Sequence, residues 1–185
     1  MPYATVAQLK EYLGISGNDD DALLGRLIEA AQAAIEARCG RRFEAVSASR
    51  QVPAAYWVGD MLFLDDDLRA LTSVVSDTGD SWSGAQFSYS PPTRVLHLRT
   101  GEPLPNPDAR YFTVTGTWGY TAVAPADITQ ATIRLAGYYY RAKDAQAYDV
   151  VGMTETGTMR VQAELPRDVL QLVEPYVVRG YAWAL

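Results

Sequence analysis

The chain opens with two segments in which apolar side chains recur at helical spacing. In the first, residues 5–14, Thr5 and Gln8 have the spacing of a capping box, and Gly14 suits a helix stop. In the second, residues 18–40, the apolar stripe consists of Leu24, Leu27, Ile28, Ala31 and Ile35. This spacing predicts a long helix with one face turned to a core, ending at Gly40.

Three aspartates, Asp19, Asp20 and Asp21, stand at the start of this second helix. We expect Asn18 to cap the helix and the carboxylates to interact with the partial positive charge of its first turn. Consecutive helical residues point about 100° apart, so the three carboxylates cannot converge on one metal ion.

A second triplet, Asp65, Asp66 and Asp67, follows an apolar run at residues 61–64. We interpret it as a solvated turn after a strand. Two carboxylates on one strand face are a weak metal signal when no further ligand accompanies them.

Between residues 43 and 124 the pattern changes to short β-prone runs separated by turn residues. Strands at this spacing predict an antiparallel β sandwich or small barrel. Trp57, Trp82 and Trp118 fall within this block. We interpret them as core aromatics, with a sugar-stacking platform as the alternative.

Helical spacing returns after Pro125 and again from Pro166, a favoured first helical position. The adjacent residues 138–140 are all tyrosines and cannot share one helix face, so at least one ring is expected at a surface. Pro175 should kink or end the last helix.

Residues 144–165 form a connection without periodicity, and loops of that length in compact domains usually serve a function.

This order of elements predicts an α+β fold. Residues 1–42 and 125–185 would form a discontinuous bundle of about four helices that ends in a docking tail. Residues 43–124 would be the inserted antiparallel β sandwich or small barrel.

The 185-residue chain has 22 acidic and 16 basic residues, a formal charge of −6. It has no dense basic patch, so specific DNA recognition is not expected.

Cys39 is the only cysteine, which excludes an intrachain disulfide. There is no apolar run of about 20 residues and no secretory signal pattern, so we expect a soluble, intracellular chain at synthesis.

The residues that carry chemistry are sparse. His97 is the only histidine and, with a single cysteine, cannot complete a zinc site. The sequence has no phosphate-binding glycine loop and no G-x-S-x-G motif. We therefore expect no enzyme, cofactor or metal site. A hydrolase using Asp65, Asp67 or His97 stays open as an alternative.

Several stretches resemble the bacteriophage head–tail connector family, also called adaptor or head completion proteins, which is found in gene transfer agents as well. They are TVAQLKEYLGI, DDALLGRLIEAAQAAIEARCGRRF, VTGTWGY at 114–120 and LPRDVLQLVEPYVVRG at 165–180. The resemblance lies in their order and spacing and covers both helical ends, about half of the chain.

The resemblance implies a structural, non-enzymatic virion protein of the phage neck. It would form a homo-oligomeric, dodecameric ring beneath the portal protein, extend the DNA channel and dock the next neck, tail-completion or stopper protein. The free chain could instead be a monomer. Assembly would take place in the host cytoplasm, with DNA passing close by and no membrane involved. A β-sandwich carbohydrate- or protein-binding module on a helical base is the alternative.

Carried onto this sequence, the resemblance makes residues 166–185 the portal-docking segment. Its expected contacts are Pro166, Tyr176, Arg179, Tyr181, Trp183 and Leu185. Buried aromatics and arginine are the usual anchors of interfaces. The long connection would line the channel or reach a neighbouring subunit through Tyr148, Met153, Met159 and Arg160. The net negative charge suits a conduit whose wall repels DNA.

Overall fold

A computed structural model describes residues 2–144 and 165–178 of the chain. Contacts divide the chain into two compact units. The helical unit comprises Met1–Cys39 and Pro125–Leu185, and the sheet unit comprises Gly40–Ala124. Each unit is described by itself.

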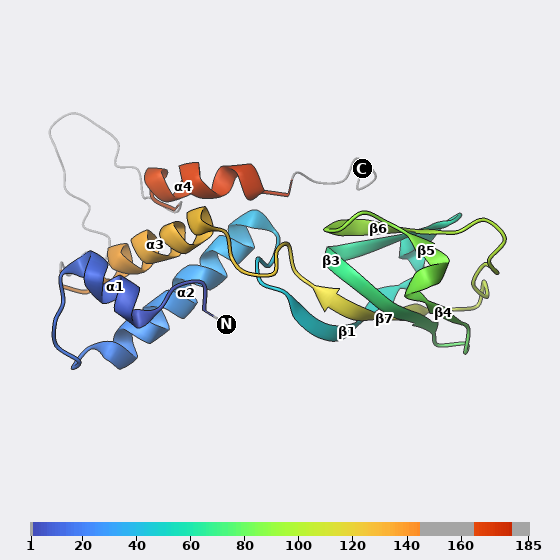
Figure 1. The fold of residues 1–185 in the computed structure, drawn as a ribbon, viewed down its shortest axis with the longest axis horizontal. Helices are drawn as coiled ribbons and strands as arrows, with labels where there is room; N and C mark the ends of the chain where they lie inside the picture. Colours follow the sequence, from blue (N-terminus) through green and yellow to red (C-terminus); the bar gives the residue numbers. More distant parts are fainter. Residues whose placement is uncertain (1, 145–164, 179–185) are drawn as a thin grey trace, which may run out of the picture. The chain divides into compact units, whose positions relative to one another are not determined.

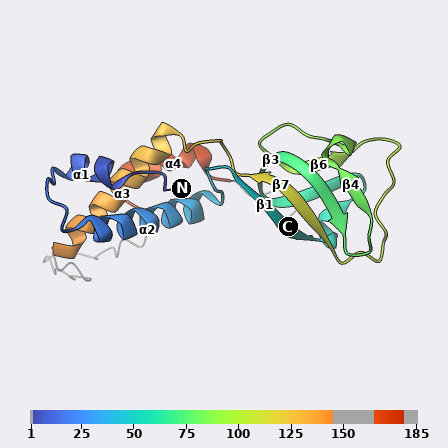
Figure 2. The same cartoon turned by 60° about the horizontal axis from the view of Figure 1, so that its bottom comes forward.

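The helical unit contains α1 (Val6–Leu13), α2 (Asp21–Cys39), α3 (Ala126–Asp144), α4 (Arg167–Val173) and the 3₁₀ turn η3 (Glu174–Tyr176). Helix α3 packs against α1, α2 and α4 (Figures 1 and 2). The core includes Leu9, Leu24, Ile28, Ala31, Ile35, Ile128, Leu135, Val169 and Val173. The stripe predicted on α2 is confirmed, with Leu27 half-buried at its margin.

The start of α1 is as predicted. Thr5 and Gln8 form a capping box, and the helix ends at Gly14 in the left-handed conformation, with φ of 73°. None of the described helices is long and apolar enough to cross a membrane.

The start of α2 differs from the prediction. The helix begins at Asp21, which is the only aspartate of the triplet in its first turn. The side-chain oxygen of Asn18 accepts a hydrogen bond from Lys10 Nζ at 2.6 Å and does not cap the helix. Lys10 Nζ also pairs with Asp21 Oδ1 at 2.9 Å. The ammonium group of Lys10 on α1 therefore binds the side chains of both Asn18 and Asp21. The sequence pattern around residue 18 did not indicate this partner.

The sheet unit contains β1 (Val46–Pro53), β2 (Trp57–Val58), β3 (Met61–Ser76), β4 (Ser81–Ser83), β5 (Phe87–Ser88), β6 (Thr93–Leu98) and β7 (Tyr111–Trp118). They form one seven-stranded antiparallel sheet in the order β1-β7-β3-β6-β5, and β2 and β4 also pair with β3. The predicted α+β class with an antiparallel insertion is confirmed. The sheet is not closed into a barrel, because β1 and β5 end the strand order and β5 is only two residues long.

One core lies inside the sheet unit. Its buried residues come from both parts of the long strand β3 and from its neighbours: Val52, Leu62, Leu64, Leu68, Leu71, Val74, Trp82, Phe87, Leu96, Leu98, Phe112, Val114 and Trp118. Trp82 and Trp118 are each 1% exposed. Their indole N–H groups donate to Pro103 O and Ala48 O, both at 3.0 Å. The prediction of core aromatics is confirmed for these two rings, which cannot serve as a sugar-stacking platform. Trp57 is half-buried and packs against the same core, with its ring centroid 5.4 Å from that of Trp82 and 4.9 Å from that of Phe112.

Candidate functional site

The described part of the predicted docking segment is α4 with η3. Val169 and Val173 turn into the core of the helical unit and are at most 1% exposed. The α-helix ends at Val173, and Pro175 lies in the 3₁₀ turn that follows. The prediction that Pro175 ends or kinks this helix is confirmed.

Polar contacts also attach this segment to α2 and α3. The backbone N–H of Val178 donates to Cys39 O at 2.9 Å. Two exposed ion pairs, Arg134–Asp168 at 3.2 Å and Arg38–Glu174 at 3.3 Å, add little stability by themselves. The buried valines and the backbone bond therefore hold the segment against the bundle.

The structure describes only two of the predicted docking contacts. Pro166 is half-buried at the N-cap of α4. Tyr176 is half-buried in η3, and its hydroxyl donates to Asp127 Oδ2 at 3.3 Å. The other predicted contacts lie outside the described residues: Arg179, Tyr181, Trp183 and Leu185 of the tail, and Tyr148, Met153, Met159 and Arg160 of the connection.

The tyrosine cluster on α3 has one exposed ring, as expected. Tyr138 is 52% exposed. Tyr140 turns the other way, and its hydroxyl donates to Asp20 Oδ2 at 2.6 Å. Burial, with a smaller effect from Tyr138, raises the pKa of Tyr139 above its usual value of 10.0. The Tyr139 hydroxyl therefore stays neutral near pH 7.

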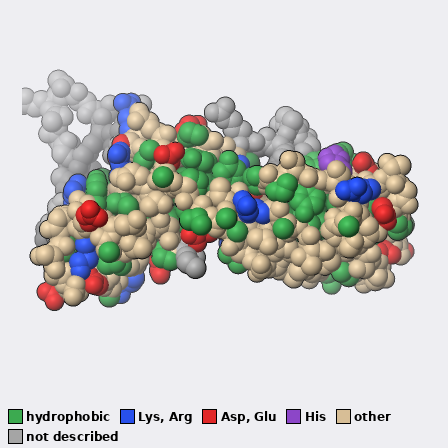
Figure 3. Space-filling model, viewed as in Figure 1, with side chains coloured by type: hydrophobic (Ala, Val, Ile, Leu, Met, Phe, Trp, Pro, Cys, Tyr) green, Lys and Arg blue, Asp and Glu red, His purple; other side chains and the backbone are tan. Residues whose placement is uncertain are grey.

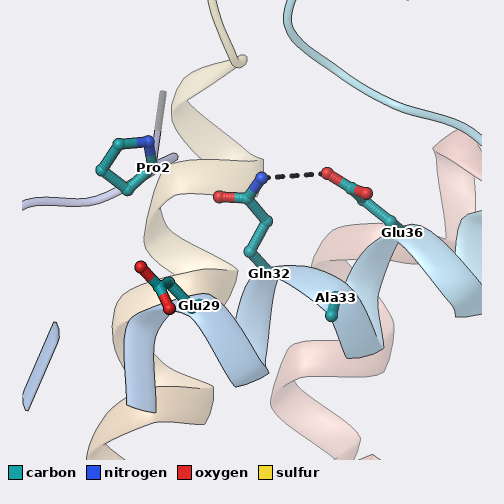
Figure 4. Close-up of a pocket in the computed structure, with 5 residues that line it drawn as sticks. All are labelled: Pro2, Glu29, Gln32, Ala33 and Glu36. Atoms are coloured by element: carbon teal, nitrogen blue, oxygen red, sulfur yellow. Dashed lines mark hydrogen bonds between the residues drawn. The ribbon is translucent and has the colours of Figure 1, made fainter. Parts of the chain in front are cut away.

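A pocket on the helical unit is lined by Pro2, Glu29, Gln32, Ala33 and Glu36 (Figure 4). Gln32 Nε2 donates to Glu36 Oε1 at 3.0 Å. The lining contains no Ser, Thr, Cys, Lys or His side chain. It therefore has no pair of a hydroxyl or thiol nucleophile with a histidine or lysine base.

The second aspartate triplet is not a solvated turn, which corrects the sequence interpretation. All three residues belong to β3, and Asp66 and Asp67 are 9% and 4% exposed. These two form a buried ion cluster with three arginines that are distant in sequence, Arg41, Arg50 and Arg94. Carboxylates can enter a strand interior only when such partners compensate their charge.

The cluster has defined geometry. Arg50 Nη1 donates to Asp66 Oδ2 at 2.7 Å, and Arg94 Nε donates to Asp67 Oδ1 at 3.0 Å. Arg41 Nε lies 3.5 Å from Asp67 Oδ2. It is a buried nitrogen without a hydrogen bond, so Arg41 contributes through charge alone at that atom. Its guanidinium stacks on the ring of Tyr120, 4.4 Å from the centroid.

Arg94 also binds the main chain where the sheet unit begins. Its Nη2 donates to Gly40 O at 2.6 Å, and its Nη1 donates to Asp65 O at 3.2 Å. The cluster thus braces the first residues of the insertion against β3 and β6. Its role is structural, because every carboxylate oxygen of Asp66 and Asp67 faces a guanidinium or a backbone N–H.

The residues of the hydrolase alternative do not form a site. His97 has a half-exposed side chain on β6, 3.8 Å from Asp60 Oδ2. Asp65 is exposed, whereas Asp67 is engaged by arginines. Among the residues that the structure describes, no group of three His, Cys, Asp or Glu side chains is placed to hold a metal ion.

Comparison with known proteins gives one family match and several structural matches. The model of a family described as head completion protein matches residues 3–178. Among curated proteins, none matches significantly.

Three solved structures resemble the chain along nearly its whole length. The neck of an empty gene transfer agent particle with C6 symmetry has 24% identity and a TM-score of 0.66, covering 96% of this chain and 91% of that chain. The neck of a native particle with C12 symmetry has 23% identity and a TM-score of 0.65, with 96% and 90% covered. The virion of a native gene transfer agent has 26% identity and a TM-score of 0.64, with 96% and 91% covered.

Proposed function

Because the chain belongs to the head completion protein family, we propose that it forms a ring beneath the portal of a tailed phage or gene transfer agent. The ring extends the DNA channel and docks the next neck or tail protein. Membership of this family makes the chain a structural head–tail adaptor and not an enzyme.

The observation that carries this proposal is the extent of the family match. It spans residues 3–178, so it includes both helical segments and the sheet unit between them. A shared fold alone would not assign a function. The lack of a catalytic arrangement in the pocket, at His97 and in the buried ion cluster is consistent with a protein that acts through its surfaces.

A dodecameric ring is the proposed assembly. The similar necks were computed with C12 and with C6 symmetry. Head-to-tail contacts between subunits give a ring when the rotation from one subunit to the next closes. Many weak contacts to a symmetric portal add up through multivalency.

The formal charge of −6 suits a channel wall past which DNA must slide. The location is the virion, after assembly in the host cytoplasm.

The portal-docking segment is residues 166–185. Its described part is held against α2 and α3, so the segment continues from a fixed point at Val178. Tyr176, Arg179, Tyr181 and Trp183 are proposed as anchors because aromatic and arginine side chains dominate binding energy at interfaces. The connection at 144–165 is proposed to line the channel or to reach a neighbouring subunit.

Deleting residues 179–185 tests the docking segment. The deletion leaves the Tyr176–Asp127 and Val178–Cys39 bonds in place, so the chain should keep its circular dichroism spectrum and melting temperature. Retention on immobilised portal-bearing capsids should fall at least tenfold. A longer deletion of residues 176–185 should also abolish attachment.

Leu104→Ala serves as the control, because it removes an exposed apolar side chain (64% exposed) outside the segment. It should bind capsids like the unmodified chain. Undiminished capture of the chain that lacks 179–185 would refute the assigned anchor.

A further inference from the structure

One face of the sheet is exposed, and its residues at paired strand positions have no side chain that is charged at neutral pH. Arg69, in the β3 bulge next to Ala70, is half-buried and donates to Tyr120 O at 3.3 Å. The face consists of outward-facing residues on β1, β7, β3 and β4, whose alternate neighbours fill the core. We call it the neutral face: Ser47, Ser49, Gln51, Pro53, Ala70, Ser73, Val75, Ser81, Ser83, Tyr111, Thr113, Thr115 and Thr117. In Figure 3 the region over β1 and β7 shows neither acidic nor basic side chains.

Strand register aligns hydroxyl groups in a row across this face. Ser49 lies opposite Thr115, Thr115 opposite Ser73, and Ser73 opposite Ser83. The hydroxyls of Ser49 and Thr115 are hydrogen bonded at 2.8 Å. Part of the polar surface is thus already satisfied within the sheet, which lowers the cost of covering it.

Tyr111 and Val75 provide apolar area on the same face. They are 38% and 37% exposed. Tyrosine is enriched at interfaces because it offers a large apolar ring with a polar end. At its paired positions the face therefore combines apolar contact area with hydroxyls and has no charge to desolvate.

Net charge indicates which partner this face suits. Each copy of the chain carries a formal charge of −6, so two copies repel wherever their acidic surfaces approach. A face without charges avoids like-charge contact and the cost of burying an unpaired ion. It is therefore a surface that an equally acidic neighbour can approach at low electrostatic cost.

The neutral face also runs up to an open strand edge. Strand β1 ends the strand order and pairs with β7 over its whole length in regular register. Proline occurs only at its last position, Pro53. An edge strand of this kind presents backbone donors and acceptors to another polypeptide. This observation points to a protein partner independently of the charge argument.

We propose that the neutral face is the surface through which the sheet unit contacts a second copy of the chain in the assembled particle. The proposal rests on the proposed ring function and adds to it the location of a subunit contact. In a ring the contact is heterologous, so the neutral face meets a different surface of its neighbour.

Site-specific photo-crosslinking in assembled particles tests the proposal. Benzoylphenylalanine is placed at Ser49, on the exposed edge of the neutral face, and at Ser88 of β5 as an exposed control outside it. After irradiation of purified particles, the Ser49 position should yield a product of two copies of this chain, identified by mass spectrometry. The Ser88 position should yield at least tenfold less of that product.

The possible results distinguish a failure of the neutral-face proposal from a failure of the proposed function. A Ser49 crosslink to another virion protein, or none in particles that contain the chain, would overturn the neutral face as a subunit contact and leave the proposed function standing. Absence of the unmodified chain from particles would overturn the proposed function and this inference with it.

Charge substitution at Ser49 provides a second test of the neutral-face proposal. Ser49→Glu introduces a carboxylate into the face, and Ser49→Gln introduces a side chain of the same length without charge. The copies per particle should fall at least fivefold for Ser49→Glu and stay unchanged for Ser49→Gln and for Ser88→Glu. Equal incorporation of all three variants would overturn the inference.

Discussion

Arg94 shows how much of the sheet unit depends on single side chains. Its guanidinium binds the carboxylate of Asp67 and the carbonyls of Gly40 and Asp65, and its side chain is 9% exposed. Removing one member of a buried ion cluster leaves its partners charged and desolvated. That cost exceeds the net stability of the intact pair.

We predict that Arg94→Ala lowers the free energy of unfolding by about 3–5 kcal/mol. Urea titration followed by tryptophan fluorescence measures this change, because Trp82 and Trp118 report on the same core. Arg42→Ala, at an exposed position of the same unit, is the control and should change stability by about 0.5 kcal/mol or less. A similar small effect for Arg94→Ala would contradict the assigned bracing role.

Asp80 should make stability depend on pH in the acid range. A hydrogen bond from the backbone N–H of Asn106, at 3.0 Å, is the main cause that lowers the pKa of Asp80 below its usual value of 3.8. Burial opposes the shift, and the hydroxyls of Thr78 and Ser76 assist it. The unfolded chain then binds the proton more readily, so this contribution is present above pH 3.8 and is lost as pH falls through the folded pKa.

We therefore predict that Asp80→Asn flattens the fall in melting temperature below about pH 4. Melting scans between pH 2 and 6 measure the difference. Asp65→Asn, at an exposed carboxylate of the same sheet unit, is the control. An unchanged acid slope in Asp80→Asn would contradict the assignment.

At the scale of elements, the pairing of β3 with β7 depends on close backbone approach. A Cβ on Gly116 would lie 2.3 Å from Ala70 O and 3.0 Å from Leu68 Cδ1. Neither the strand backbone nor the buried leucine can move without disturbing the core. The glycine in VTGTWGY is therefore required by packing in the sheet.

We predict that Gly116→Ala destabilises the chain by about 1–3 kcal/mol, as overpacked cores do. Gly25→Ala in α2 is the matched control, because a Cβ there meets nothing within 4 Å. That control should stabilise the chain by about 0.5–1 kcal/mol through the helix propensity of alanine. Thermal unfolding of both variants distinguishes the two cases, and stabilisation by Gly116→Ala would contradict the packing argument.

At the scale of the whole molecule, the sheet unit is a continuous segment with its own core. Its two ends are joined by backbone hydrogen bonds, from Tyr120 N to Arg42 O at 2.9 Å and from Thr121 N to Phe43 O at 3.0 Å. Adjacent ends are what an insertion into another unit requires.

We predict that residues 40–124 fold when expressed alone. A cooperative thermal transition and dispersed amide resonances would support independent folding, since the segment keeps its hydrophobic core and its ion cluster. The complementary polypeptide joins residues 1–39 directly to 125–185, and it should keep its helical circular dichroism. A disordered 40–124 fragment would show that the two units fold only together.

The sequence alone determined the local features. Helical spacing identified the stripe of α2, the capping box of α1 and the end of α4 before Pro175, because these depend on residues a few positions apart. The order of patterns also indicated an insertion between helical segments, and the order and spacing of quoted stretches indicated the family.

Only the tertiary structure determined the position and burial of polar groups whose partners are distant in the sequence. Asp66 and Asp67 belong to a strand because arginines from β1, β6 and residue 41 neutralise them, and no local pattern contains that information. The capping role expected of Asn18 was wrong, because α2 begins only at Asp21 and Lys10 binds the Asn18 side chain. The neutral face likewise follows from strand register, which places Ser49, Thr115, Ser73 and Ser83 in one row. Local propensity acts within a few residues, whereas charge compensation and strand pairing act across the folded chain.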